Sequence, residues 1–407
     1  MAQEKLLPQI AKYMITRLHL HNWKSFEDAD LYIDPLTFVI GTNASGKSNI
    51  LDALNFLKRV SEGTLIKECI SEVRGSEDWM ILQGKSHFAL TVDVEEGDYT
   101  YVYTIGVSRI GNTCVLTEEV LKRRWKNTLE RVLYNAEHAN NNSNEPSLDT
   151  RFTTGRRGNP KRMNLSRNTA VLTQVEVISV VKEVRDAASI VRKTLNNIFV
   201  LMPDTTAMRD YSPLSERLRQ DGSNIAGVLA AMDEDKQKDI EEKLTKYLKP
   251  LPEKDLNRVW AEAVGRFNRD AMLYCEEQWT DEAVTFDARC MSDGTLRFVA
   301  VVAALLTENP GSLLVIEEID NGLHPSRSED LVRVLRELGE LGGIDVLCTT
   351  HNPVLIDALG NEMIPFISFV KRNERGYSYI ELLEEKENLA KLMSTGRIGD
   401  LMIEDRL

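Results

Sequence analysis

The chain has 407 residues, and its 50 Lys and Arg side chains against 63 Asp and Glu side chains give a formal net charge of −13. Hydrophobic residues make up 42% of the chain and charged residues 28%, so it can bury a sizeable core and is not a disordered protein. The acidic balance excludes a uniformly basic coat for nucleic acids but leaves room for local basic patches.

Cysteine spacing and the length of the apolar segments exclude further classes. The five cysteines are scattered and form no C-x-x-C pair, which indicates reduced thiols rather than a disulfide framework or a zinc site. No segment approaches ~18 uninterrupted apolar residues, and residues 1–14 lack the apolar stretch of a secretory signal. We therefore expect a cytoplasmic protein that makes no contact with a membrane.

The first part of the chain is predicted to be rich in strands. Apolar and polar side chains follow a strand pattern in residues 14–23, 36–40, 87–94 and 99–107. One amphipathic helix, residues 47–60, interrupts these strands.

The rest of the chain changes character twice. Residues 115–285 are more charged and more helical in pattern, and several prolines mark breaks. Residues 286–371 alternate helices and apolar strands, and residues 372–407 hold one strand and a short, partly helical end. We expect an α/β protein in which residues 1–114 and 286–371 form one sheet and residues 115–285 a mainly helical insertion.

A complete phosphate-binding motif lies early in the chain. Residues 41–48 read GTNASGKS, which matches G-x-x-x-x-G-K-[ST], and the predicted strand and helix flank it as the motif requires. Backbone N–H groups of such a loop cradle phosphates at the start of a helix, Lys47 would reach the β- and γ-phosphates, and the Ser48 hydroxyl would bind Mg²⁺. The predicted nucleotide-binding residues here are Gly41, Asn43, Ala44, Ser45, Gly46, Lys47, Ser48 and Asn49.

Two acidic residues end a later apolar strand. Residues 312–316 are apolar enough for a buried parallel strand, and Glu317 and Glu318 follow directly. Carboxylates at this edge beside a P-loop can hold the Mg²⁺ shell and polarise water. We assign Glu317 to the metal and Glu318 to the attacking water, as general base or orienting group. The alternative, an ordinary acidic strand end, is less favourable because Asp320 follows.

The next predicted strand, residues 346–350, ends in His351. A histidine at that edge can place a hydrogen bond near the γ-phosphate, whereas a lone histidine is more often a structural residue. Its position after the acidic pair favours the functional role.

The segment Met291-Ser292-Asp293-Gly294-Thr295 opens a predicted helix. Ser292 is a plausible N-cap, and the exposed N–H groups would make a second anion site. One fold does not need two phosphate sites unless the second binds the nucleotide of a partner chain. The alternative interpretation of this segment is an ordinary capped helix without a ligand.

The order of these motifs resembles the ABC-type ATPases of the SMC, RecF and OLD kind, including bacterial "AAA family ATPase" proteins. Residues 18–56 are similar to the first strands and P-loop of those heads, and residues 313–325, LLVIEEIDNGLHP, are similar to their Walker B motif and D-loop. Residues 291–298, MSDGTLRF, resemble a variant ABC signature in which Met291 replaces Leu and Asp293 replaces Gly. The resemblance is good over residues 14–110 and 286–371, and weak between them.

That resemblance implies an ABC-type head with an N-terminal antiparallel β lobe, which uses ATP and Mg²⁺ in a head-to-tail dimer. Each nucleotide would touch Lys47 and Ser48 of one chain and Ser292 and Gly294 of the other, with Asp320 at the dimer contact. A larger homo-oligomer is also compatible with it.

The same resemblance implies that His351 acts as a switch and that a Q-loop glutamine binds the metal. Gln174 is the candidate and Gln83 the alternative. Arg74 lies in a segment that is similar to the family, but the sequence assigns it no role.

Two stretches are basic despite the acidic total. Residues 121–131 and 151–167 each hold five or more Lys and Arg side chains. Such clusters can contact nucleic-acid phosphates. They can equally form a solvated face or meet an acidic partner.

The tail bears on the choice of effector. OLD-type proteins carry a C-terminal TOPRIM nuclease, but only 407 − 351 = 56 residues follow His351. We therefore expect no nuclease domain in residues 372–407, and any nuclease would be a separate chain.

Three functions remain in competition. The first is a switch or sensor ATPase of a bacterial anti-phage system that controls a separate nuclease or toxin, as in the ATPase subunits of PARIS, Septu and retron systems. The second is a RecF- or SMC-like repair or maintenance ATPase that binds DNA. The third, the ATP-binding subunit of a transporter, fits poorly with the N-terminal lobe and the variant signature.

Overall fold

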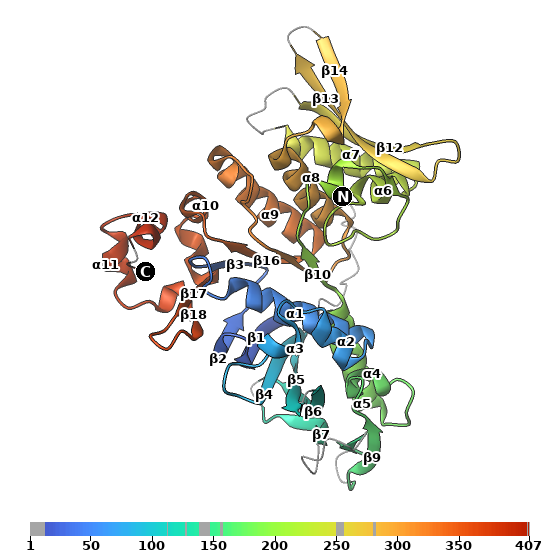
Figure 1. Cartoon of the computed structure of the whole chain (residues 1–407), viewed down its shortest axis with the longest axis vertical. Coiled ribbons are helices and arrows are strands. Elements are labelled where there is room, and N and C mark those ends of the chain that lie inside the picture. The colour runs from blue at the N-terminus through green and yellow to red at the C-terminus, as the bar shows by residue number, and fades with distance from the viewer. Residues whose placement is uncertain are drawn as a thin grey trace, which may run out of the picture.

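The computed structural model describes most of the chain, namely residues 13–111, 113–126, 128–137, 147–154, 158–249, 256–279, 282–404 and 406. A sheet of 14 strands runs through the molecule (Figure 1). One half of it is parallel and consists, in spatial order, of β10 (Ile198–Leu201), β15 (Leu313–Ile316), β16 (Asp345–Thr350), β3 (Leu36–Ile40) and β17 (Ile367–Arg372).

The other half of the sheet is mostly antiparallel. Its strands continue in the order β18 (Ser378–Leu382), β2 (Phe26–Tyr32), β1 (Met14–Trp23), β4 (His87–Glu96), β5 (Tyr99–Ile110), β6 (Thr113–Trp125), β7 (Arg131–Glu137), β8 (Ser147–Phe152) and β9 (Lys161–Ser166). The expected N-terminal antiparallel lobe is therefore present and extends well beyond residue 114.

The parallel strands separate two hydrophobic cores. Successive side chains of a strand point to opposite faces. Val39 and Val315 accordingly lie in one core, while Phe38 and Leu314 lie in the other. All four are buried, which is the pattern of a sheet covered on both faces.

Helices cover the two faces of this sheet. The helices α1 (Lys47–Glu62), α2 (Ile66–Ser71) and α5 (Lys182–Asn196) contribute to the core shared with the antiparallel lobe. The other core is built largely from α6 (Ile225–Ala230), α7 (Glu234–Leu248), α8 (Asp293–Thr307), α9 (Ser328–Gly342) and α10 (Pro353–Ala358). Within the described residues, no helix is both long and apolar enough to cross a membrane.

A second, four-stranded sheet lies at the far end from the antiparallel lobe (Figure 1). In it β13 (Asp270–Trp279) pairs with β12 (Leu256–Val264) along one edge and with β11 (Ser212–Pro213) and β14 (Glu282–Asp287) along the other. The short helices α3 (Ser76–Trp79), α4 (Val171–Gln174), α11 (Leu389–Met393) and α12 (Ile398–Ile403) complete the regular structure.

The prediction of a mainly helical insertion over residues 115–285 is wrong. This region contributes β7–β9 and most of β6 to the large sheet, β10 to the parallel half, and all of the second sheet except the end of β14. Charged and short strands such as β9 are stabilised by pairing with neighbours, which a local pattern does not reveal. The expected boundaries at residues 114, 285 and 371 fall inside β6, β14 and β17.

Candidate functional site

The P-loop joins β3 to α1, so the predicted strand, loop and helix are all present. The loop requires glycine at two positions, because Gly41 has φ +154° and Gly46 has φ +122°. A Cβ atom on Gly41 would lie 2.4 Å from the Val370 carbonyl oxygen, and one on Gly46 would lie 2.6 Å from the Ser378 hydroxyl. The backbone of residues 41–46 is thus held close to β17 and β18.

Polar groups of the loop are arranged for an anion. Lys47 Nζ donates hydrogen bonds to the carbonyl oxygens of Gly41 (2.7 Å) and Thr42 (2.9 Å). Burial lowers the pKa of Lys47, and the neighbouring carboxylates, led by Glu318, oppose that shift. Ser45 Oγ is buried and has no hydrogen-bond partner among the described residues. A phosphate here would satisfy both the lysine and the serine.

A cleft of about 480 Å³ adjoins the loop. The P-loop residues Asn43 and Ala44, the latter at φ +62°, form part of one wall. The full lining is Thr42, Asn43, Ala44, Ser45, Lys371, Arg372 and Tyr379. A larger cleft of about 890 Å³ lies near the amino-terminal ends of β10 and β15 and is lined by none of residues 41–49.

The acidic pair ends β15 at the same edge of the sheet as the P-loop. The strands β15, β16 and β3 are parallel neighbours, so their carboxyl ends meet there. Glu318 has φ +46°, an unusual conformation for a residue with a side chain, and its N–H donates to Thr349 Oγ1 at 2.9 Å. Such strain often marks a functional position and costs roughly 1–3 kcal/mol.

His351 and Asp320 lie beside the acidic pair. His351 Nδ1 is 3.7 Å from Glu318 Oε1 and makes no hydrogen bond within the described residues. The Thr350 hydroxyl donates to Asp320 Oδ1 at 2.6 Å. His351, Glu318 and Asp320 therefore lie close together at the carboxyl ends of β15 and β16.

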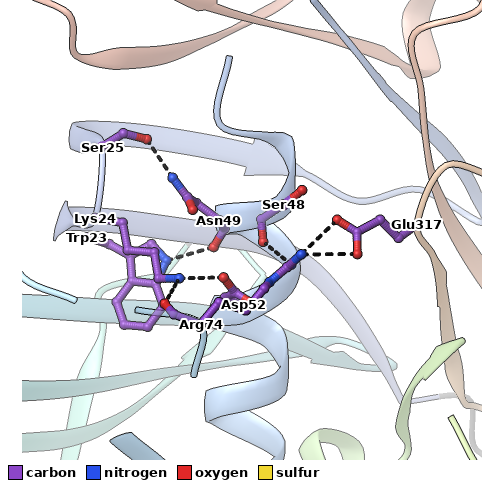
Figure 2. A network of polar contacts seen from close by, with 8 residues as sticks. All are labelled: Trp23, Lys24, Ser25, Ser48, Asn49, Asp52, Arg74 and Glu317. Atoms are coloured by element: carbon purple, nitrogen blue, oxygen red, sulfur yellow. Dashed lines mark hydrogen bonds and ion pairs between the residues drawn. The ribbon is translucent and has the colours of Figure 1, made fainter. Parts of the chain in front are cut away.

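Arg74 is the main residue at this edge that the sequence analysis did not assign to the site (Figure 2). Its Nη1 lies 3.1 Å from Glu317 Oε1, its Nη2 donates to the Ser48 carbonyl oxygen at 3.0 Å, and its Nε donates to Asp52 Oδ1 at 2.9 Å. Burial lowers the pKa of the Arg74 guanidinium, but Asp52 and Glu317 raise it further, so the net direction is upward. The only sequence signal was its place in a segment similar to the family.

The same network ties the P-loop helix to the turn between β1 and β2 (Figure 2). Lys24 Nζ forms an ion pair with Asp52, and Trp23 Nε1 donates to the Asn49 carbonyl oxygen at 2.7 Å. Asn49 Nδ2 in turn donates to Ser25 Oγ at 2.8 Å. The first turn of α1 is thereby fixed against the antiparallel lobe.

The surroundings of Ser48 and Glu317 suit a cation. The positively charged guanidinium of Arg74 bridges the Ser48 carbonyl oxygen and the Glu317 carboxylate. Hydroxyl and carboxylate oxygens are the ligands that Mg²⁺ prefers. Ser48 and Glu317 therefore fit the predicted metal-binding role.

Ser292 caps α8, as predicted from the sequence. Its Oγ accepts a hydrogen bond from Thr295 N–H at 3.1 Å, and the next residue, Asp293, forms an ion pair with Arg209 at 2.8 Å. A Cβ atom on Gly294 would lie 2.7 Å from the Gly322 carbonyl oxygen. The start of α8 thus packs closely against the turn that follows Asp320, while Ser292 itself is exposed.

The prediction that Gln174 binds the metal is wrong for this structure. Its Nε2 donates to the carbonyl oxygens of Ser166 (2.8 Å) and Thr169 (3.0 Å), which holds it in a local turn. The adjacent Thr173 lies beside Gly63, which follows the last turn of α1, whereas the P-loop precedes the first turn. The 16 residues of α1 place these two ends roughly 24 Å apart. Gln83, the alternative, is exposed. It follows Leu82, whose N–H donates to the Asn22 carbonyl oxygen, and it precedes β4.

Part of the positive charge of the two basic stretches is paired with carboxylates within the chain. Arg123 and Arg131 both bind Glu183 Oε1, at 2.6 and 2.8 Å. Lys122 pairs with Glu130 at 3.0 Å. Arg156 and Arg157 lie outside the described residues. The described part of these stretches is therefore a less basic surface than the sequence indicated.

Comparisons with known proteins agree with this geometry. A family model described as "AAA domain, putative AbiEii toxin, Type IV TA system" matches residues 36–357, from the P-loop strand to beyond His351. No curated protein matches the chain.

Solved structures of SMC heads are similar to this chain. The SMC head bound to the C-winged helix domain of ScpA has 16% identity and a TM-score of 0.50, over 90% of this chain and 97% of that one. The head with an extended coiled coil from Pyrococcus furiosus has 15% identity and a TM-score of 0.47, over 94% and 100% of the two chains. The head from Thermotoga maritima has 14% identity and a TM-score of 0.40, over 91% and 98%. The first of these likenesses shows the fold, an ABC-type ATPase head.

Proposed function

The chain belongs to this AAA-domain family and has the fold of an ABC-type ATPase head. From that premise we propose that it is an ATPase of the SMC- and RecF-like branch, which binds ATP with Mg²⁺ and hydrolyses it. The observation that carries the proposal is the meeting of the P-loop, the acidic pair and His351 at one edge of the parallel sheet.

Each residue at this edge has a chemical task. Lys47 and the N–H groups of the loop bind the β- and γ-phosphates. Mg²⁺, held by Ser48 and Glu317, would neutralise charge on the phosphate oxygens. Glu318 orients the attacking water and accepts its proton, and His351 lies close enough to Glu318 to respond to the γ-phosphate.

We also propose that the complete site needs a second copy of the chain. The exposed Ser292 and the N–H groups at the start of α8 form an anion-binding surface of the kind that would contact a partner's nucleotide. Gly294 and Asp320 lie on the two segments that pack together there. A head-to-tail dimer, alone or within a larger homo-oligomer, accounts for this arrangement.

Two substitutions test the ATPase proposal. Lys47→Ala is expected to abolish ATP binding, measured by isothermal titration calorimetry, whereas Lys67→Ala on the exposed face of α2 should leave it unchanged. Glu318→Gln should still bind ATP but slow its hydrolysis by roughly 10²–10⁴-fold, since a general base contributes that much. It should also accumulate as an ATP-bound dimer in size-exclusion chromatography.

The matched control for the second substitution is Glu340→Gln on the exposed side of α9, which should hydrolyse ATP as the wild type does. Unchanged ATP affinity in Lys47→Ala would disprove the P-loop assignment. Wild-type turnover in Glu318→Gln would place the catalytic carboxylate elsewhere.

For the biological role, we propose a nucleotide-controlled switch that acts on a separate effector, a nuclease or toxin of an anti-phage system. The family's description as a putative toxin of a type IV toxin–antitoxin system supports a role alongside a second protein. The internal pairing of Arg123 and Arg131 with Glu183 favours this role over the alternative, a RecF- or SMC-like repair ATPase that binds DNA.

Co-purification separates the two roles. Tagged Glu318→Gln protein is isolated from native cells with ATP present, and the material that accompanies it is identified. A nuclease or toxin-like chain, absent when Lys47→Ala is used as bait, supports the switch. Nucleic acid without a protein partner supports the repair role.

A further inference from the structure

Two histidines and two aspartates face one another across the hairpin of β1 and β2. In the antiparallel register His19 lies opposite Asp30, and His21 lies opposite Asp28. Residues two apart in a strand share a face, so all four side chains project from the same side of the sheet. They are partly exposed, with His19 the least accessible at 24% of its side chain.

Three of these side chains converge on one point. His19 Nε2 is 3.0 Å from Asp28 Oδ1, and His21 Nδ1 is 3.7 Å from the same oxygen. One ligand atom from each of His19, His21 and Asp28 lies within 4.8 Å of the other two. Ligands at 2.0–2.1 Å around a tetrahedral metal are spaced roughly 3.3 Å apart, so the two contacts at Asp28 bracket the spacing that a metal requires.

The ring nitrogen of His19 that faces away from Asp28, Nδ1, contacts a carboxylate, as in many metal sites. It lies 3.0 Å from Asp30 Oδ1. A carboxylate that accepts the Nδ1–H bond fixes the ring and leaves the Nε2 lone pair free to bind a metal. That Nε2 atom is the one that lies 3.0 Å from Asp28 Oδ1.

The second ring nitrogen of His21, Nε2, contacts the side-chain amide of Asn22. Asn22 Nδ2 lies 2.9 Å from His21 Nε2, while Asn22 Oδ1 is buried and has no hydrogen-bond partner among the described residues. Exchanging the two amide atoms by a 180° rotation presents Oδ1 to Nε2–H. His21 then carries its proton on Nε2 and offers the Nδ1 lone pair to the centre.

We propose that His19, His21 and Asp28 form a binding site for a divalent transition metal, Zn²⁺ in the cell, with Asp30 and Asn22 orienting the two imidazoles. Two imidazole nitrogens and one carboxylate oxygen are a Zn²⁺ ligand set, and the exposed position leaves room for water as the fourth ligand. Mg²⁺ prefers an all-oxygen shell and is a poor match.

The position of this site gives it a structural consequence. The pair of His21 and Asp28 is followed, towards the turn, by the last pair of the hairpin, Trp23 and Phe26. The turn carries Lys24 and Ser25, which hold the first turn of α1 through Asp52 and Asn49. A metal that joins β1 to β2 here would stabilise the hairpin against which the P-loop helix is fixed.

Cobalt binding by the full-length protein tests the proposal. After treatment with a chelator, and without nucleotide, the wild type is titrated with Co²⁺ and followed by visible d–d absorption. We expect one bound equivalent that Zn²⁺ displaces and an excess of Mg²⁺ does not. His19→Gln and His21→Gln should each abolish this absorption, and Asp30→Asn should weaken binding roughly 10- to 100-fold.

The control is His324→Gln, an exposed histidine far along the chain in the segment before α9, which should bind Co²⁺ as the wild type does. Circular dichroism of the metal-free proteins verifies that each variant is folded, and the more exposed His21 is the safer of the two to replace. A wild type that binds no Co²⁺ at submillimolar concentration would show that the four side chains form only ion pairs. Wild-type affinity in both histidine variants would equally overturn the proposal.

Discussion

A buried acid in the antiparallel lobe leads to a quantitative prediction about stability. The Glu119 side chain is fully buried, and its carboxyl oxygens accept four hydrogen bonds. The donors are the hydroxyls of Tyr103 (3.1 Å) and Tyr134 (2.9 Å) and the N–H groups of Val171 (2.6 Å) and Leu172 (2.7 Å). Glu119 therefore joins β5, β6 and β7 to the start of α4.

Burial raises the pKa of Glu119 to about 7 from an ordinary value of 4.5, despite these hydrogen bonds. Between those two values the folded protein holds a proton that the unfolded chain releases, so the free energy of unfolding falls as the pH rises. The contribution is fully present below the unfolded value and is lost above about pH 7. From about pH 5 to about pH 8 the expected loss is about 2–3 kcal/mol.

The measurement compares the wild type with Glu119→Gln, which has nearly the same shape and does not titrate. Urea unfolding followed by circular dichroism gives the free energy of unfolding of both proteins at the two pH values. The stability of the wild type relative to the variant should fall by about 2–3 kcal/mol between the two pH values. A constant difference would mean that the four hydrogen bonds outweigh burial.

Further predictions concern the P-loop and its support. Lys24→Ala is expected to cost about 3 kcal/mol in urea unfolding, because Lys24 and Asp52 form a mostly buried ion pair with side-chain exposures of 7% and 9%. Arg74→Ala should cost about 1 kcal/mol or less, since Arg74 is half exposed, and an equal loss in the two variants would refute the burial argument. Gly41→Ala should abolish ATP binding, because its Cβ would meet the Val370 carbonyl at 2.4 Å. Gly84→Ala also has a positive φ but meets nothing within 4 Å, so it should bind ATP normally.

Local motifs predicted the parts of the fold and site that local chemistry determines. The P-loop needs glycine where φ is positive, and residues 41 and 46 supply it. Ser292 is a residue type that caps helices, and it caps α8 through Thr295. These features require only a few neighbouring residues, so they can be read directly from the sequence.

Features that depend on distant segments were not predictable in this way. The strand β10 has only four residues, IFVL, and a short apolar run cannot be distinguished from part of a helix until its pairing with β15 is known. Gln174 was chosen for its residue type, but its position at the far end of α1 depends on how α4 packs. Arg74 reaches Glu317 across 243 positions of sequence, a contact that no local pattern contains.

The contact between Arg74 and Glu317 also has an energetic meaning for the proposed ATPase. Glu317 is the predicted metal-binding carboxylate, yet in this structure both of its oxygens lie within 3.3 Å of the Arg74 guanidinium. Since like charges repel at short range, a divalent cation bound to Glu317 would weaken the ion pair between Glu317 and Arg74. The Arg74 carbonyl oxygen in turn accepts a hydrogen bond from Lys24 Nζ at 2.7 Å. Metal binding at the proposed site would therefore act on the turn between β1 and β2 through the contacts of Arg74 with Glu317 and Lys24.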